Sequence, residues 1–237
     1  MKKLKQLSEC NLPFTYTVVV AKYLENIDWI SKYDIAPNTV VYDKSGEIDL
    51  DVSYNIIPIK NFGRESHSYL YHIIKNYDNL SDVLVFTQGD PEPHTDLDLW
   101  VEDMYQAFLT GYFNRWEFGT CNGHTGYYFN IHSYGGVPME LIDMTFGEWF
   151  NKVFGEDLPC PITWKPGASG IVVSSDLIKT RPKEFYQMLY NRLDNKCNPA
   201  EGHFFERSWY YIFNCHKYSK NIINTFSNMD AFLTTSY

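Results

Sequence analysis

Apolar segments near the N-terminus predict short buried strands that alternate with helices. Residues 15–21, 39–42 and 56–59 are rich in apolar, often β-branched side chains and end in polar turns, which is typical of strands in a parallel sheet. Apolar positions recur at helical spacing over residues 66–77 and predict an amphipathic helix. The alternation predicts an α/β fold: a mixed, mostly parallel central sheet flanked by helices.

A fourth apolar segment, residues 83–87, ends abruptly at Gln88, Gly89 and Asp90, before Pro91. The glycine and the proline stop the predicted strand and leave a carboxylate at its carboxyl end. Ligands of open α/β sheets bind at that end of the strands. Asp90 is therefore predicted either to hold a metal or polar ligand or to cap a turn.

The second half of the chain predicts mainly helices and one further strand. A long segment rich in Gly, Asn, Tyr and His, residues 111–136, predicts an irregular connection. Because we find neither an internal repeat nor a low-complexity linker, we expect a single domain after an extension of residues 1–14. The strand is predicted at 171–174, and the helices at 99–109, after the capping box Thr145 to Glu148, at 182–193 and at 199–213.

Charge and cysteine content narrow the function classes. The net charge of −9 argues against a nucleic-acid partner bound mainly through phosphate neutralisation. The five cysteines form no CxxC pair, which fits reduced thiols better than a thiolate zinc site or a disulfide framework. We see no signal-peptide pattern and no apolar run of about 20 residues. We therefore expect a cytoplasmic protein without a membrane span, in the host cytoplasm if it is viral.

Common catalytic and cofactor motifs are missing from the sequence. It contains neither GxGxxG nor GxxxxGK[ST], so an ordinary dinucleotide fold or a P-loop enzyme is disfavoured. It contains neither GxSxG nor HExxH, which disfavours a serine-hydrolase elbow and a zinc protease.

Two charged constellations lie at predicted helices. Arg64 and Glu65 lie between a strand end and a helix start, where an arginine pairs either with a phosphate or with its neighbouring glutamate. His203 and Glu206 are three residues apart and share a helix face. Bulky neighbours predict a raised pKa for Glu206 and a role as general base; the alternative is an ordinary helix-face charge.

Two further constellations have ordinary structural alternatives. Trp164 is followed by the small residues Gly167 and Ala168, which predicts either a sugar-stacking site or a tight loop with a core tryptophan. Asp96 and Asp98 are either metal ligands or N-terminal caps of the helix that follows them.

The sequence also resembles a known family. The segments VVVAKYLENIDWI, NFGRESHSYLYHIIKNYDNL and DVLVFTQGDPEPH, and later ASGIVVSSDLIKTRPKEFYQMLY and HFFERSW, resemble a domain-of-unknown-function family found in fungi, plants, bacteria and large DNA viruses. That family is in turn similar to the glycosyltransferase domain of a chlorella virus protein, which has the GT-A fold. The resemblance implies a GT-A-like domain over residues 15–237, with a nucleotide-binding half at 15–95 and an acceptor half at 96–237.

The resemblance also implies roles for single residues. Gln88 to Asp90 would stand at the Asp-x-Asp motif of this fold, with glutamine replacing its first aspartate. Asp90, with His203 completing the shell, would hold Mn²⁺ or Mg²⁺, and Asp96 or Asp98 is an alternative ligand. Glu206 would deprotonate the acceptor, with Asp157 as a weaker candidate. The nucleotide would contact Ala21, Tyr23, Asp43, Lys44, Arg64 and Gln88.

The leading hypothesis is therefore a glycosyltransferase that moves a sugar from a nucleotide sugar, expected to be a UDP-sugar, to a glycan or another hydroxyl acceptor. Trp164, Gly167 and Ala168, together with Tyr127 and Tyr128, would line the acceptor side. Because Gln88 replaces an aspartate, a catalytically inactive nucleotide- or glycan-binding protein is the first alternative. A metal-dependent hydrolase is the second, with a cluster formed by Asp90, His94, Asp96 and Asp98.

Overall fold

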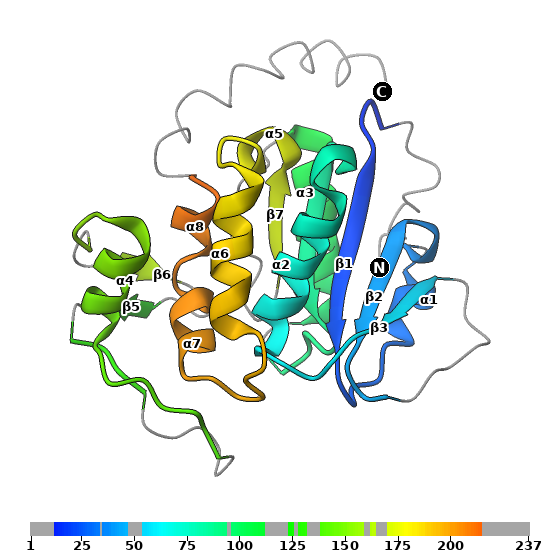
Figure 1. Cartoon of the computed structure of the whole chain (residues 1–237). Coiled ribbons are helices and arrows are strands. Elements are labelled where there is room, and N and C mark those ends of the chain that lie inside the picture. Colours follow the sequence, from blue (N-terminus) through cyan, green and yellow to red (C-terminus); the bar gives the residue numbers. More distant parts are fainter. Residues whose placement is uncertain are drawn as a thin grey trace.

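A five-stranded sheet forms the centre of a single α/β domain in the computed structural model (Figure 1). The strand order is β3 (Asn55–Pro58), β2 (Thr39–Asp43), β1 (Tyr16–Lys22), β4 (Val83–Gln88) and β7 (Ile171–Ser174). The first four strands are parallel, and β7 runs antiparallel to β4. The structure describes residues 12–33, 35–46, 54–93, 96–111, 123–125, 128–131, 138–158, 162–164 and 170–214.

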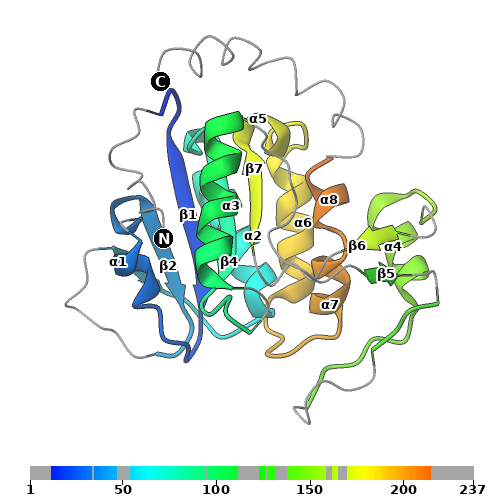
Figure 2. The same ribbon diagram turned by 180° about the vertical axis from the view of Figure 1, so that it is seen from behind.

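Helices cover both faces of the sheet, so its strands are apolar on both sides (Figures 1 and 2). Val18 and Val20 of β1 pack in the cluster with α1 (Trp29–Lys32) and α3 (Leu97–Thr110). Val19 and Ala21 point into the opposite cluster. The helices of that face are α2 (Arg64–Asn76), α5 (Ser175–Ile178), α6 (Lys183–Leu193), α7 (Glu201–Glu206) and α8 (Trp209–Ile212).

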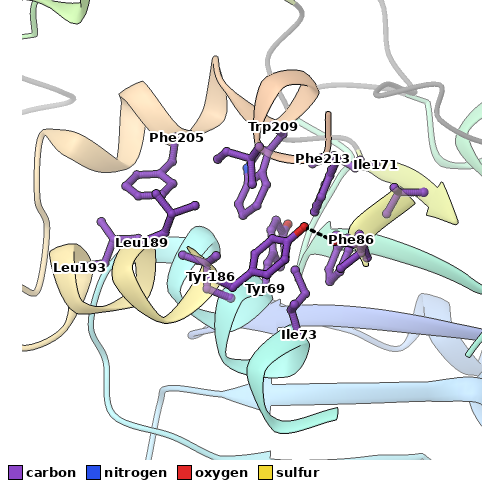
Figure 3. Close-up of a cluster of buried hydrophobic side chains, with 14 of the residues drawn as sticks. Tyr69, Ile73, Phe86, Ile171, Tyr186, Leu189, Leu193, Phe205, Trp209 and Phe213 are labelled. Atoms are coloured by element: carbon purple, nitrogen blue, oxygen red, sulfur yellow. Dashed lines mark hydrogen bonds between the residues drawn. The ribbon is translucent and has the colours of Figure 1, made fainter. Parts of the chain in front are cut away.

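Aromatic rings dominate the core on the face of α2 and α6 (Figure 3). Tyr69 of α2 packs against Phe86 of β4 and Trp209 of α8, with ring centroids 5.1 and 5.7 Å away. Beside α7 lie α4 (Phe146–Phe154) and a two-stranded sheet of β5 (Gly123–Thr125) and β6 (Ile162–Trp164) (Figures 1 and 2). Trp149 of α4 contacts Phe204 of α7 at 5.6 Å, which joins this part to the main core.

The register of the parallel strands brings the ends of β1, β2 and β4 to one edge of the sheet. In β1, Lys22 pairs with Asp43 of β2, and Ala21 pairs with Gln88 of β4. The carboxyl ends of these strands and the start of α2 therefore lie at the lower edge in Figure 1, where α7 also lies. We call this the carboxyl edge; the candidate site lies there.

The predicted strands and the capping box of α4 are confirmed. The prediction of one continuous helix over residues 199–213 is wrong. It is divided into α7 and α8 at Arg207 and Ser208. The Ser208 hydroxyl donates to the Phe204 carbonyl at 2.8 Å, and the Ser208 N–H donates to the Phe205 carbonyl at 2.8 Å. These bonds tighten the turn and end α7. None of the described helices has the length and hydropathy needed to cross a bilayer.

Candidate functional site

The ends of β1 and β2 are joined by a partly buried ion pair. Lys22 Nζ donates to Asp43 Oδ2 at 2.9 Å, and the Ser45 N–H and hydroxyl donate to Asp43 Oδ1 at 2.7 and 2.6 Å. Asp43, predicted to contact the nucleotide, is only 3% exposed, and both of its oxygens accept hydrogen bonds. This carboxylate therefore fixes the two strand ends in register.

Lys44 connects the end of β2 to the turn that begins α2. Its ammonium group donates to the carbonyl of Phe62 at 2.7 Å and to the carbonyl of Arg64. Burial lowers the pKa of Lys44 to about 7, while the charges of Glu65 and Glu25 act in the opposite direction. Lys44 thus holds the main chain that presents Arg64.

That turn contains two consecutive left-handed residues, Gly63 at φ 59° and Arg64 at φ 52°. A Cβ on Gly63 would lie 2.7 Å from the Cβ atoms of His67 and Leu193, so only glycine fits at this position. A left-handed arginine is strained, and such residues concentrate at functional sites.

Five titratable side chains meet where α2 faces α7: Arg64, Glu65, His203, Glu206 and Arg207. We call them the Arg64 cluster. Arg64 Nη1 lies 3.2 Å from His203 Nε2, Arg64 Nη2 lies 3.7 Å from Glu206 Oε1, and Arg64 Nε lies 3.6 Å from Glu65 Oε2. On the far side, Glu206 Oε2 lies 3.3 Å from His203 Nδ1 and 3.4 Å from Arg207 Nη1. Most of these distances exceed those of tight hydrogen bonds, so the cluster is loosely joined.

The two carboxyl groups of the cluster have opposite pKa shifts. Burial alone would raise the pKa of Glu206, but the hydrogen bond and charge of His203, with Arg64 and Arg207, lower it to about 2. Burial raises the pKa of Glu65, and the charge of the neighbouring Glu206 carboxylate raises it further, against the effect of Arg64. The predicted raised pKa of Glu206 is thus wrong in direction, and the raised value belongs to Glu65. Such divergent carboxyl pairs are typical of acid–base sites.

Asp90 closes the turn after β4. Its Oδ1 accepts the Glu92 N–H at 3.0 Å, and its carbonyl accepts Gln88 Nε2 at 2.5 Å. The Gly89 carbonyl accepts the Trp29 indole N–H at 2.8 Å. The turn-capping interpretation of Asp90 is therefore observed, and one of its oxygens is used in that turn.

The candidate metal ligands do not form a metal centre by themselves. Both ring nitrogens of His203 face other side chains, Arg64 and Glu206. Over the ranges that the structure describes, no three His, Cys, Asp or Glu side chains are grouped so as to hold an ion. Asp90 as a ligand of Mn²⁺ or Mg²⁺ stays a prediction.

Asp96 and Asp98 have other partners. Asp96 caps α3 by accepting the Leu99 N–H at 3.1 Å, as the capping interpretation predicts. Asp98 accepts a hydrogen bond from the Tyr33 hydroxyl and lies 3.6 Å from Lys32 Nζ.

The nucleotide residues predicted on β1 differ in exposure. The side chain of Ala21 packs in the core, so only its main chain faces the edge. Tyr23 follows β1 and is 45% exposed.

The predicted acceptor residues are largely outside the described part. Trp164 lies in β6, opposite Gly123 of β5. Tyr128 is strongly exposed, and the exposed Asp157 accepts a hydrogen bond from Asn151 at 3.3 Å. The candidates Gly167, Ala168, His94 and Tyr127 lie outside the described residues.

Sequence reasoning missed Glu25 and underrated Glu65. Glu25 Oε2 accepts the Tyr23 N–H at 2.6 Å, and a Cβ on Gly89 would lie 2.9 Å from the same oxygen. Glu25 follows β1 in the chain, and its carboxylate lies beside Gly89 at the end of the neighbouring strand β4. The one usable signal was its place just after a predicted strand, since parallel strand ends share an edge.

Comparison with known proteins identifies a family but no activity. A family model described as "Protein of unknown function (DUF3431)" matches residues 18–224. No curated protein and no solved structure matches the chain.

Proposed function

The chain belongs to the DUF3431 family, and we propose that it binds a nucleoside-diphosphate sugar at the carboxyl edge and transfers the sugar to a hydroxyl acceptor. One observation carries the proposal: the Arg64 cluster lies at the carboxyl edge of the parallel strands β1, β2 and β4. Ligands of open α/β sheets bind at this edge. The sequence resemblance to the glycosyltransferase domain of a chlorella virus protein agrees with it.

The donor would be bound by charge and by stacking. The side chain of Arg64 is 21% exposed, so it can reach a diphosphate while its main chain is held by Lys44. A guanidinium group binds phosphate through two parallel hydrogen bonds. The exposed ring of Tyr23, at the end of β1, would contact the base.

Glu206 would accept the proton of the acceptor. Its low pKa keeps it ionised at neutral pH, the state that a proton acceptor needs. In a direct displacement, the acceptor O–H bond breaks and its proton passes to a Glu206 oxygen. The acceptor oxygen then bonds to the anomeric carbon, and the bond from that carbon to the diphosphate breaks. The nucleoside diphosphate leaves with the electron pair.

Calorimetry with UDP, with and without Mn²⁺, tests donor binding, and release of UDP from a UDP-sugar tests turnover. We expect binding of UDP and slow UDP release even without an added acceptor, with water in its place. If no nucleoside diphosphate binds under either condition, the proposal is wrong.

A second function, binding without turnover, is favoured by the same pKa. A carboxylate with a pKa of about 2 is a weak base, and Gln88 replaces a potential metal ligand. Tight UDP-sugar binding without UDP release over a long incubation would identify this function. The hydrolase alternative gains no support, since Asp96 and Asp98 are engaged in other contacts.

A further inference from the structure

The hydroxyl of Tyr69 is buried in the core without a hydrogen-bond partner among the described residues. Its ring is fully enclosed by apolar neighbours, including Phe86 and Trp209 (Figure 3). A phenylalanine would fill the same space without burying a hydroxyl. An unpartnered buried hydroxyl destabilises a protein, so its presence requires an explanation.

Tyr186 shows how a buried tyrosine is ordinarily accommodated in the same cluster. It is also fully buried, and its hydroxyl donates to the Ile178 carbonyl at 2.8 Å. Tyr69 and Tyr186 therefore differ in one respect: Tyr186 has a protein acceptor and Tyr69 has none in the described part.

The polar groups that act on the Tyr69 hydroxyl are carboxyl groups. Glu65 lies four residues earlier on α2, and its charge acts on the phenol most strongly, followed by Glu206 of α7 and Glu25 after β1. Burial is the main cause that raises the pKa of Tyr69, and the carboxylates raise it further. The hydroxyl therefore keeps its proton and is available as a donor.

The two carboxyl groups next to this position are partly exposed at the carboxyl edge. The side chains of Glu65 and Glu206 are 13% and 16% exposed, whereas Tyr69 lies fully buried. The basic groups around the carboxyl pair are Arg64 on α2, His203 and Arg207 on α7, and Lys44 after β2. These basic groups face the carboxyl groups, which leaves the phenol as an uncharged donor beside them.

We propose that Tyr69, Glu65 and Glu206 form a binding site for a ligand hydroxyl of the kind that a sugar presents. A hydroxyl both accepts and donates. It would accept a hydrogen bond from Tyr69 and donate one to the ionised Glu206, which satisfies the buried phenol. The assignment of the ligand as a sugar rests on the proposed function, whereas the role of Tyr69 in binding a hydroxyl does not.

Tyr69→Phe, with Tyr186→Phe as the matched control, tests the site in the free protein. Thermal unfolding should show an unchanged or higher Tm for Tyr69→Phe, which removes an unpartnered hydroxyl. Tyr186→Phe should lower the Tm by about 2–4 °C, because it removes a made hydrogen bond. A Tyr69→Phe variant whose Tm falls as far as that of Tyr186→Phe would show that the Tyr69 hydroxyl already has a partner, and overturns the proposal. Carbon NMR signals of the glutamate carboxyl groups, assigned with Glu65→Gln and Glu206→Gln, report on the site when a ligand is added.

Ligand binding supplies the second measurement. The affinities of UDP, UDP-glucose, UDP-galactose and UDP-N-acetylglucosamine are compared by calorimetry. We expect one of the sugars to increase affinity over UDP in the wild type, and this advantage to fall about fivefold in Tyr69→Phe but not in Tyr186→Phe. Equal affinities for UDP and all three UDP-sugars in the wild type overturn the proposal. An advantage that Tyr69→Phe leaves intact overturns it too.

A wild type that binds neither UDP nor any UDP-sugar contradicts the proposed function and not the hydroxyl site. The site is then decided with free glucose, galactose and N-acetylglucosamine at high concentration. A sugar that perturbs the Glu65 and Glu206 carboxyl signals in the wild type but not in Tyr69→Phe supports the site. If no sugar perturbs them, the site is rejected.

Discussion

Two glutamates on the same short helix, α7, are held in opposite ways. Glu201 Oε1 accepts the Trp149 indole N–H at 2.7 Å and Arg192 Nε at 2.6 Å, and its Oε2 accepts Lys196 Nζ at 3.1 Å. Among the described residues, Glu206 makes longer contacts, 3.3 to 3.7 Å, with His203, Arg207 and Arg64. Glu201 is 3% exposed, whereas the side chain of Glu206 is 16% exposed at the carboxyl edge.

The difference separates a structural carboxylate from one available to a ligand. The donors to Glu201 come from α4, from α6 and from the loop after α6, so it joins three parts of the second half of the chain. The loose contacts of Glu206 leave its oxygens able to exchange partners. Both residues are glutamates on one short helix, Glu201 at its first position and Glu206 at its last, and the donors that surround each of them decide its role.

The largest expected effect is the loss of stability in Glu201→Gln. The amide keeps the shape but leaves Arg192 and Lys196 without a carboxylate, and breaking a buried pair costs about 3 kcal/mol. Urea unfolding measures it, at unchanged m-value. A loss below about 1 kcal/mol would contradict the structural role.

Glu206→Gln should reduce turnover strongly and stability only slightly. We expect turnover, measured as UDP release, to fall about a hundredfold or more, because the proton acceptor is removed. Stability should fall by only about 1 kcal/mol, because the neighbouring Glu65 can ionise in its place. A Glu206→Gln variant as unstable as Glu201→Gln would abolish the distinction between the two glutamates.

Arg64→Lys probes the donor side of the same cluster. Lysine keeps the charge but loses the planar fork, so the affinity for UDP should fall about tenfold, which is about 1.4 kcal/mol. Arg192→Lys, beside Glu201, is the matched control and should leave UDP affinity unchanged. Equal affinities of Arg64→Lys and the wild type would remove Arg64 from the phosphate site.

The smallest expected effect is a change in the pH dependence of stability between Glu206→Gln and the wild type. Because the pKa of Glu206 is lowered to about 2, its contribution to folding is present above pH 4.5 and is lost as the pH falls toward 2. Urea unfolding should therefore show a shallower loss of stability below pH 4.5 in Glu206→Gln than in the wild type. Parallel curves for the two proteins would show that Glu206 has no lowered pKa.

The sheet was predictable from sequence because its strands are continuous apolar segments with polar ends. Residues 83–87 fall within β4, and the turn role of Asp90 was one of two stated alternatives. The break of the helix at Ser208 was not predicted, because it depends on which carbonyl a hydroxyl contacts. Sequence periodicity contains no information on that choice.

The candidate site was predicted only in part. Arg64, His203 and Glu206 were each named, but their contact spans 139 positions from Arg64 to His203, which no local pattern reveals. The pKa of Glu206 was predicted in the wrong direction for the same reason. Burial was foreseen from its bulky neighbours, whereas the basic groups that outweigh burial come from elsewhere in the chain.

The reversed direction of β7 has a consequence for the order of folding. Because β7 is antiparallel, α6 returns the chain to the carboxyl edge (Figure 1). There the Lys196 carbonyl accepts the Gly63 N–H at 2.7 Å. Contacts of such large sequence separation form slowly, after local helices and neighbouring strands. We therefore expect the Arg64 cluster to be completed only when α7 docks on an already paired sheet. Local opening of α7 and α8 would switch the site off while the sheet stays folded, and amide hydrogen exchange would detect it as a separate, less protected unit.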